Sequence, residues 1–326
     1  MTHTFKLARR TARLRGMALA SLFLVASGCD NMNRLEPSDP TDTPVSAITA
    51  DTLDVATDAT GPSFYTGSSA PGIAFGAFDL PNTRLNTTFS GAVRASGPSD
   101  ILGTLAAARR VGARLVVRLS GEPAYFQNSD GTVNLTKWKA RVARFKSVNL
   151  ASYISDGTFL GHYMIDEPHD ASNWGGKPVP FSTLEAMAKY SKQLWPGLAT
   201  MVRTTPVWLA KASFRYVYLD AAWTQYSVRF GNISSWISSQ AAAARNEGLG
   251  LVVGLNWLHG GRTSGRYPMT ASQIKTLGTI LATNTSACAF YGWRYDGTYF
   301  GRSDIKSAMA TVAYKAKSRS RKSCKV

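Results

Sequence analysis

Cysteine and histidine are scarce in this chain, which contains three cysteines and four histidines in 326 residues. Three cysteines cannot form the disulfide framework that stabilises small secreted domains. The His-Glu-x-x-His pattern and the paired cysteines of zinc sites are also missing, so we expect neither a catalytic metal nor a cofactor. No phosphate-binding Gly-x₄-Gly-Lys-Ser/Thr loop, no Gly-x-Ser-x-Gly elbow and no Gly-x-Gly-x-x-Gly after the first apolar run occur. Their absence disfavours nucleotide-dependent enzymes and esterases.

Charged residues make up 17% of the chain, and the formal net charge of +17 is concentrated at its ends. Residues 1–28 hold five basic side chains and residues 315–326 hold six, in both cases without an acid. We therefore expect no nucleic-acid partner and interpret residues 319–326 as a basic tail that follows a solvated helix end. Acidic polysaccharide, lipopolysaccharide phosphates or nucleic acid are alternative ligands of this tail.

An apolar run at residues 17–27 (MALASLFLVAS) follows the basic N-terminus. It is too short to cross about 30 Å of hydrocarbon and is typical of a secretory signal peptide. The sequence that ends at Cys29 resembles the bacterial lipobox, with Ala26 where leucine is usual. This resemblance implies a signal peptide over residues 1–28, a lipid on Cys29 as membrane anchor, and export to the bacterial cell envelope. Ordinary cleavage nearby, with Cys29 unmodified, is the alternative.

Residues 29–71 are rich in Asp, Thr, Ser and Pro, which predicts a flexible tether. Beyond it, short apolar runs alternate with amphipathic stretches that carry capping boxes at 182–185 and 270–273. Runs of this kind are buried on both faces, as in a parallel sheet covered by helices. They lie at 72–79, 113–120, 159–167, 198–204, 215–220, 249–257 and 289–296.

This alternation predicts an α/β fold, a (β/α)8 TIM barrel over residues 72–318. Only seven strands are apparent, so we expect the eighth between residues 121 and 157, or an incomplete barrel. Barrel enzymes place their active residues at the C-terminal ends of strands. The polar and aromatic residues at those ends are Asp79, Arg118, Asp166, Glu167, Arg203, Asp220, Asn256, Trp257, Trp293, Arg294 and Asp296.

The most specific of these strand ends is Asp166-Glu167-Pro168. It resembles the Asn-Glu-Pro that ends strand four in barrel glycoside hydrolases of clan A, in which the glutamate is the acid/base. The resemblance implies that Glu167 is a general acid, with Asp166 in place of the asparagine. A carboxyl held against aromatic walls has its pKa raised, as this role requires. Asp166 paired with Arg118 or Arg294 in a structural ion pair is the alternative.

The second carboxylate is not evident. Clan A enzymes take a glutamate from strand seven, whereas the run at 249–257 ends in Asn256 and Trp257. Asp220 and Asp296 are therefore the candidate partners of Glu167. Inverting glycosidases separate the two carboxyls by about 6.5–9.5 Å and retaining ones by about 5–5.5 Å.

Flat aromatic side chains beside hydrogen-bonding groups suit the apolar faces and hydroxyls of sugars. The predicted substrate-binding residues are Asp79, Arg118, Asp166, Trp223, Gln225, Tyr226, Asn256, Trp257, Trp293 and Arg294. The function we expect is a glycoside hydrolase-like enzyme that cleaves a poly- or oligosaccharide with two carboxylates. A non-catalytic carbohydrate-binding lipoprotein of the envelope is the alternative. We expect Cys288 to be a buried free thiol, with a disulfide to Cys324 as the other option.

Overall fold

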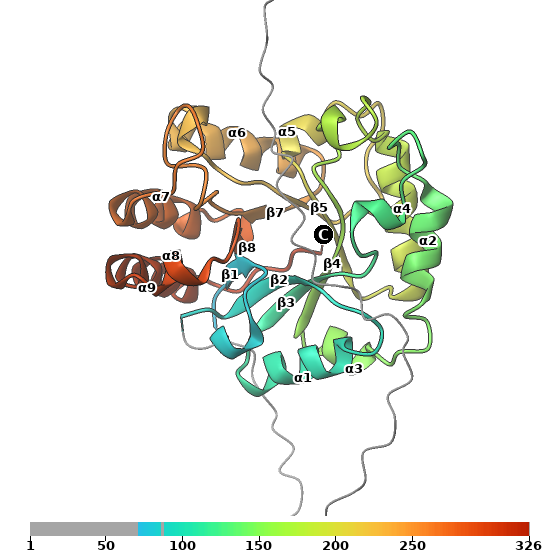
Figure 1. The fold of residues 1–326 in the computed structure, drawn as a ribbon, viewed down its shortest axis with the longest axis horizontal. Coiled ribbons are helices and arrows are strands. Elements are labelled where there is room, and N and C mark those ends of the chain that lie inside the picture. Colours follow the sequence, from blue (N-terminus) through green and yellow to red (C-terminus); the bar gives the residue numbers. More distant parts are fainter. Residues whose placement is uncertain (1–70, 86–87, 326) are drawn as a thin grey trace, which may run out of the picture. The chain divides into compact units, whose positions relative to one another are not determined.

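The strands form a closed parallel barrel, as the sequence predicts. This computed structural model describes residues 71–85 and 88–325, and within them the strands follow one another in chain order around the wall (Figure 1). Pairing of β1 with β8 closes the barrel. The strands are β1 (Ala74–Phe78), β2 (Gly91–Ala95), β3 (Arg114–Arg118), β4 (Phe159–Asp166), β5 (Ala199–Arg203), β6 (Ala221–Trp223), β7 (Gly250–Val253) and β8 (Ala287–Gly292).

Helices surround this wall in Figure 1. They are α1 (Ile101–Arg110), α2 (Leu135–Ala143), α3 (Ala151–Ser155), α4 (Phe181–Leu194), α5 (Pro206–Leu209), α6 (Ile233–Asn246), α7 (Ala271–Thr283), α8 (Gly297–Gly301) and α9 (Ser303–Lys317). The capping box predicted at Thr270 is present at the start of α7. The one predicted at Ser182 is wrong, because α4 begins at Phe181 without a side-chain cap. No helix among the described residues is long and apolar enough to span a membrane.

The strand that the sequence pattern does not show is β2. It lies before β3, whereas we expected it between residues 121 and 157, where the structure has α2 and α3. β2 reads Gly-Ala-Val-Arg-Ala and its last two residues are partly exposed, so it lacks a continuous apolar run. Gly76 of β1 allows β2 to approach closely, since a Cβ on Gly76 would lie 1.8 Å from the carbonyl oxygen of Gly91.

The expected strand at residues 215–220 is also wrong, because β6 follows that segment. Val217 is 77% exposed, and the segment is a loop held by the carboxylate of Glu185 on α4. This carboxylate accepts hydrogen bonds from the backbone N–H groups of Val217, Tyr218 and Leu219 at 2.7, 2.9 and 3.2 Å. Asp220 therefore precedes β6 and lies at the N-terminal end of the barrel.

The C-terminal residues pack beneath the barrel. α9 ends at Lys317, and the segment after it returns to the N-terminal ends of the strands. There Cys324, which is 1% exposed, forms a disulfide with Cys288 of β8 with a Cα–Cα distance of 5.2 Å. This corrects the expectation of a free thiol at Cys288, while the basic side chains of the tail beside Cys324 are exposed. The predicted signal peptide, Cys29 and the tether lie outside the described residues.

Candidate active site

Arg203, the last residue of β5, connects the polar side chains at the C-terminal mouth of the barrel. Its side chain is 10% exposed, and each guanidinium nitrogen has a partner. Nε donates to Asp166, Nη1 donates to Oε1 of Gln225 at 2.8 Å, and Nη2 lies 3.2 Å from Oε1 of Glu167. The guanidinium also lies over the indole of Trp293, 4.4 Å from the ring centre. A buried cation is thus balanced by two carboxylates and one aromatic face.

The strand register explains why these groups meet. Asp166 pairs with Arg203 across the β4–β5 ladder, so the two side chains emerge next to each other. The backbone N–H of Glu167 then donates to the carbonyl oxygen of Arg203 at 3.0 Å. Side-chain exposure rises from 22% at Asp166 to 34% at Glu167. The deeper carboxylate therefore serves the ion pair, and the outer one reaches solvent and any ligand in the mouth.

The pKa of the Glu167 carboxyl is raised above its usual value. Burial is the largest cause, and the negative charges of Asp166 and Asp170 add to it. Arg203 acts in the opposite direction, because its positive charge favours the carboxylate. Removal from water outweighs this attraction, so Glu167 keeps its proton to a higher pH than an exposed glutamate does.

Asp79 is the second mouth acid with a raised pKa, and it directly follows β1. The residue is exposed at the rim, but the protein around its carboxyl removes part of the surrounding water and so raises the pKa. The guanidinium groups of Arg294, Arg118 and Arg94 lower the pKa, in that order of effect. Arg118 itself pairs with Glu122. Asp79 thus lies among cations that favour its ionised form, in surroundings that make it a stronger base than a solvated aspartate.

The backbone singles out the same two acids. Asp79 has a φ of 57° and Glu167 a φ of 39°, and these are the non-glycine residues with positive φ among those that the structure describes. A left-handed conformation at such a residue costs on the order of 1–3 kcal/mol and tends to occur at functional sites. The chain therefore accepts a strained backbone at both carboxylates, which is typical of functional sites.

Asp220, a predicted catalytic residue, lies at the opposite end of the barrel. Its Oδ2 accepts a hydrogen bond from the backbone N–H of Thr200 at 2.8 Å and forms an ion pair with Lys192. These contacts tie the start of β6 to β5 and to α4. We therefore correct the prediction, because Asp220 is a structural residue far along the barrel from Glu167.

Asp296 follows β8 and is exposed, but its carboxylate caps α8 by accepting from the N–H of Tyr299 at 2.8 Å. Asn256 uses its Oδ1 in a similar local bond, from the N–H of His259 at 3.1 Å. Neither side chain shares a hydrogen bond with the Arg203 cluster. In the sequence pattern, a cap and a catalytic acid at a strand end cannot be told apart.

Two of the predicted substrate-binding aromatics belong to the core instead. Trp257 is fully buried between the wall and the helices, where its ring centre lies 5.3 Å from that of Phe300. Tyr226 is 2% exposed and packs against Trp236 on α6. Both predictions are therefore corrected, since their rings contact the helical layer.

Other aromatic residues do reach the barrel axis. Trp223 is 2% exposed inside the barrel, and its Nε1 donates to the carbonyl oxygen of Tyr291 at 2.8 Å. Trp293 is half-buried above it and packs against Phe78 with tilted rings whose centres are 4.6 Å apart. Arg294 is exposed beside it, and the Trp293–Arg294 peptide bond is cis. The floor of the mouth is aromatic.

Arg203 and Tyr163 are the residues to which the sequence analysis assigns no role. Tyr163 is fully buried beneath Asp166, and burial raises the pKa of its hydroxyl well above 10. The position of Arg203 at a strand end adjoining Asp166 and Glu167 was the available signal. Among the described residues, no group of three or more His, Cys, Asp or Glu side chains gathers as a metal site.

Solved structures with the same architecture include carbohydrate-active enzymes. A β-glucanase from Saccharophagus degradans superposes with a TM-score of 0.54 and 11% identity, over 76% of this chain and 88% of that one. A cellulase in complex with an inhibitor gives a TM-score of 0.50 and 10% identity, over 76% and 92%. At these identities the likeness shows the barrel fold. No family model and no curated protein sequence matches the chain.

Proposed function

We propose that the protein is a glycoside hydrolase acting on a poly- or oligosaccharide, with Glu167 as general acid and Asp79 as the second carboxylate. The observation that carries this proposal is that the same two residues combine an unusual backbone conformation with a raised carboxyl pKa. Both follow a strand at the C-terminal mouth, both have positive φ, and partial removal from water raises the pKa of both carboxyls. The expected partners Asp220 and Asp296 are replaced by Asp79, because their carboxylates serve structural contacts.

In this mechanism Glu167 transfers its proton to the glycosidic oxygen as the bond to the anomeric carbon breaks. The glutamate that remains carries a negative charge 3.2 Å from Nη2 of Arg203, which stabilises it. Asp79 accepts a proton from a water that attacks the anomeric carbon from the other face. Its raised pKa favours this step, because a more basic carboxylate removes the proton more readily.

The positions of the two strands favour inversion at the anomeric carbon. β2 and β3 lie between β1 and β4 in the wall, so three strand spacings of about 4.8 Å separate their ends. Three such spacings amount to about 14 Å along the wall, more than the about 5–5.5 Å of retaining enzymes, and side chains that converge over the mouth would shorten it toward the about 6.5–9.5 Å that admits a water between acid and base. The anomer released first, observed by NMR, tests this expectation.

Aromatic side chains supply the surface for the sugar. Trp293 is half-buried at the mouth and packs against Phe78 with tilted rings, so part of its indole surface remains for the apolar face of a pyranose ring. The exposed Arg294 and the half-buried Gln225 offer hydrogen bonds beside it. The β-glucanase and cellulase that share the fold support a polysaccharide substrate.

The test is release of reducing ends from a panel of polysaccharides. We expect Glu167→Gln and Asp79→Asn each to lower kcat by about 10²–10⁴-fold, the usual contribution of one acid or base. Asp296→Asn is the matched control, because it removes an exposed carboxylate at a neighbouring strand end that caps α8. Full activity in both Glu167→Gln and Asp79→Asn would refute the mechanism.

A non-catalytic carbohydrate-binding protein is the second candidate. The end of β7, where clan A enzymes carry a glutamate, has Asn256, whose Oδ1 is bound to the N–H of His259. Glycan-array binding that survives in Glu167→Gln, without reducing-end release by the parent protein, would favour this candidate.

We also place the protein in the bacterial envelope through a lipid on Cys29. Labelling with radioactive palmitate in the bacterial host is expected for the parent chain and absent in Cys29→Ser. Equal labelling of the two proteins would refute lipidation at this residue.

A further inference from the structure

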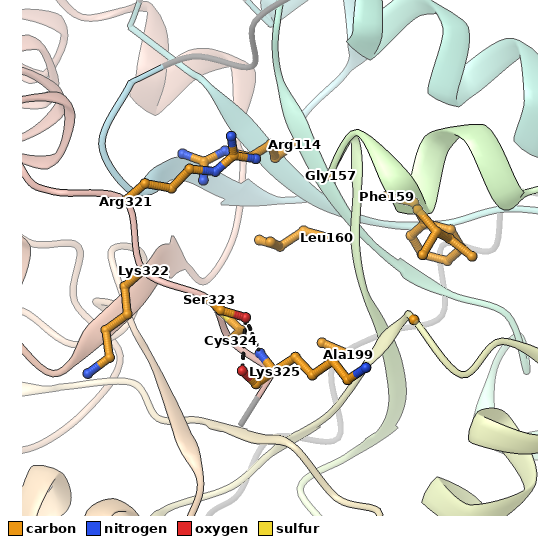
Figure 2. A pocket seen from close by; sticks show the side chains of 12 residues that line it. Arg114, Gly157, Phe159, Leu160, Ala199, Arg321, Lys322, Ser323, Cys324 and Lys325 are labelled. Carbon is orange, nitrogen blue, oxygen red and sulfur yellow. Dashed lines mark hydrogen bonds between the residues drawn. The ribbon is translucent and has the colours of Figure 1, made fainter.

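A cavity of about 410 Å³ lies at the N-terminal end of the barrel, opposite the mouth that holds Glu167. Its wall comes from the starts of β3, β4 and β5, from the loops before β4 and β5, and from tail residues 321–325. Figure 2 shows these side chains around the space. The volume falls in the range of about 300–1,000 Å³ that small-molecule sites occupy.

Arg114, the first residue of β3, contributes an uncompensated positive charge. It is fully buried, and only its Nη2 has a partner, the carbonyl oxygen of Gly72 at 2.6 Å. Nε and Nη1 are buried without a hydrogen-bond partner. Burying an unpaired cation costs several kcal/mol, so its persistence in a cavity wall points to an anion that completes it.

The other charged groups of the cavity are also positive. Arg321, Lys322 and Lys325 come from the tail, and no Asp or Glu is among the lining residues. Burial lowers the pKa of the Arg114 guanidinium, and the nearby positive charge of Arg321 adds a smaller effect in the same direction. Two like charges are held together here by the Cys288–Cys324 disulfide, which fixes the tail under the barrel.

The remaining wall is largely apolar. Ile154, Phe159, Leu160 and Ala199 line it, and the half-buried Ile154 and Leu160 leave apolar surface accessible. A bare inorganic ion would satisfy Arg114 but leave this surface uncovered. A ligand that combines an oxyanion with an apolar group would pair with Arg114 and also cover the apolar wall.

We infer that this cavity binds a small organic phosphate or sulfate, whose oxyanion pairs with Arg114 and Arg321 and whose apolar part packs on Ile154 and Leu160. Guanidinium groups are suited to such oxyanions, because several N–H donors converge on one group. The site is independent of the proposed hydrolase chemistry, since it lies at the other end of the barrel and uses none of the mouth residues.

The experiment measures binding of phenyl phosphate to the full chain by calorimetry, at constant ionic strength with sodium chloride as the balancing salt. We expect saturable 1:1 binding and a Kd at least about tenfold higher in Arg321→Ala, the effect of losing one charge-assisted hydrogen bond. Arg321 is exposed, so this variant keeps the fold. Arg114→Met should abolish binding. Lys317→Ala removes an exposed cation outside the cavity and should leave Kd unchanged.

Two further arms separate the sources of the phosphate. Inorganic phosphate should bind more weakly than phenyl phosphate, because it leaves the apolar wall uncovered. Co-sedimentation with phosphatidylcholine vesicles, with and without phosphatidylglycerol, tests a lipid headgroup. Binding of phosphatidylglycerol alone that is lost in Arg321→Ala would support the oxyanion site and assign its phosphate to lipid. Binding unchanged in Arg114→Met and Arg321→Ala, or absent for every probe, would overturn the inference.

Discussion

Replacement of Arg203 by methionine tests the electrostatic core of the mouth. The change keeps a long side chain against Trp293 but removes the charge that faces Asp166 and Glu167. Loss of one partner from a buried ion pair costs about 3–5 kcal/mol. We expect the lower end, about 3 kcal/mol of unfolding free energy at pH 7, because both carboxylates keep some solvent contact, with 22% and 34% of their side chains exposed.

The pH dependence gives this prediction its second readout. Arg203 lowers the pKa of Glu167, so the variant raises it further. Because the destabilisation arises from ionised carboxylates without a partner, it should shrink as the pH falls and they take up protons. If Glu167 is the general acid, the alkaline limb of the kcat profile should also move to higher pH.

Urea unfolding at pH 5 and pH 7 measures the loss of stability and its pH dependence. Arg302→Met is the matched control, since Arg302 forms an exposed ion pair with Asp304 and its loss should leave stability unchanged. A cost below 1 kcal/mol at pH 7, or one that is equal at pH 5, would contradict the assignment of Arg203 as the balancing charge.

Two further predictions concern the barrel itself. Cys288→Ser combined with Cys324→Ser opens a bond that spans 36 residues and should lower the unfolding free energy by about 4 kcal/mol from loop entropy, measured in urea; no change on reduction of the parent protein would contradict it. His162 is fully buried beside Ser191, and burial lowers its pKa to about 3. Its unfolded form binds a proton below pH about 6.5, so stability should fall by about 2 kcal/mol between pH 7 and pH 5. His162→Gln should remove this contribution, and a pH dependence identical to that of the parent would refute it.

Most of the barrel could be predicted because its strands are buried on both faces. The runs at β1, β3, β4, β5, β7 and β8 are continuous and apolar, and this is the pattern that a parallel wall imposes. β2 and β6 do not show this pattern, each for a different reason. β2 carries Arg94 into the mouth, and β6 is three residues long, so neither is a long apolar run.

The error at β6 carries over to the site. The loop at 215–220 has the composition of a strand, but its backbone donors are taken up by Glu185 from α4. A contact between residues more than thirty positions apart decides this, and no local pattern contains it. Shifting the strand by a few residues moves Asp220 from the mouth to the opposite end of the barrel.

The sequence places Glu167 and Asp79 at strand ends, but it does not show that these two acids would act together as acid and base. The raised pKa of each depends on removal from water by residues distant in the sequence. At Asp79 it is opposed by Arg294, which follows β8, and by Arg118 of β3. Capping of α8 by Asp296 is settled only by the geometry of the turn. The number of acids at a barrel rim therefore overstates the number free to act, because each strand end must also satisfy the backbone of the helix that follows it.

The two ends of this barrel have opposite electrostatic requirements. At the mouth, one buried guanidinium is balanced by two carboxylates, so Arg203 is stable without a ligand. At the other end, Arg114 faces three more cations and no acid, so its balance has to come from outside the described residues. A ligand-free protein should consequently gain stability from Arg114→Met and lose it from Arg203→Met, although both changes remove a buried arginine. Opposite signs in the same urea assay would show that the charge balance around each guanidinium, and not burial alone, determines its effect.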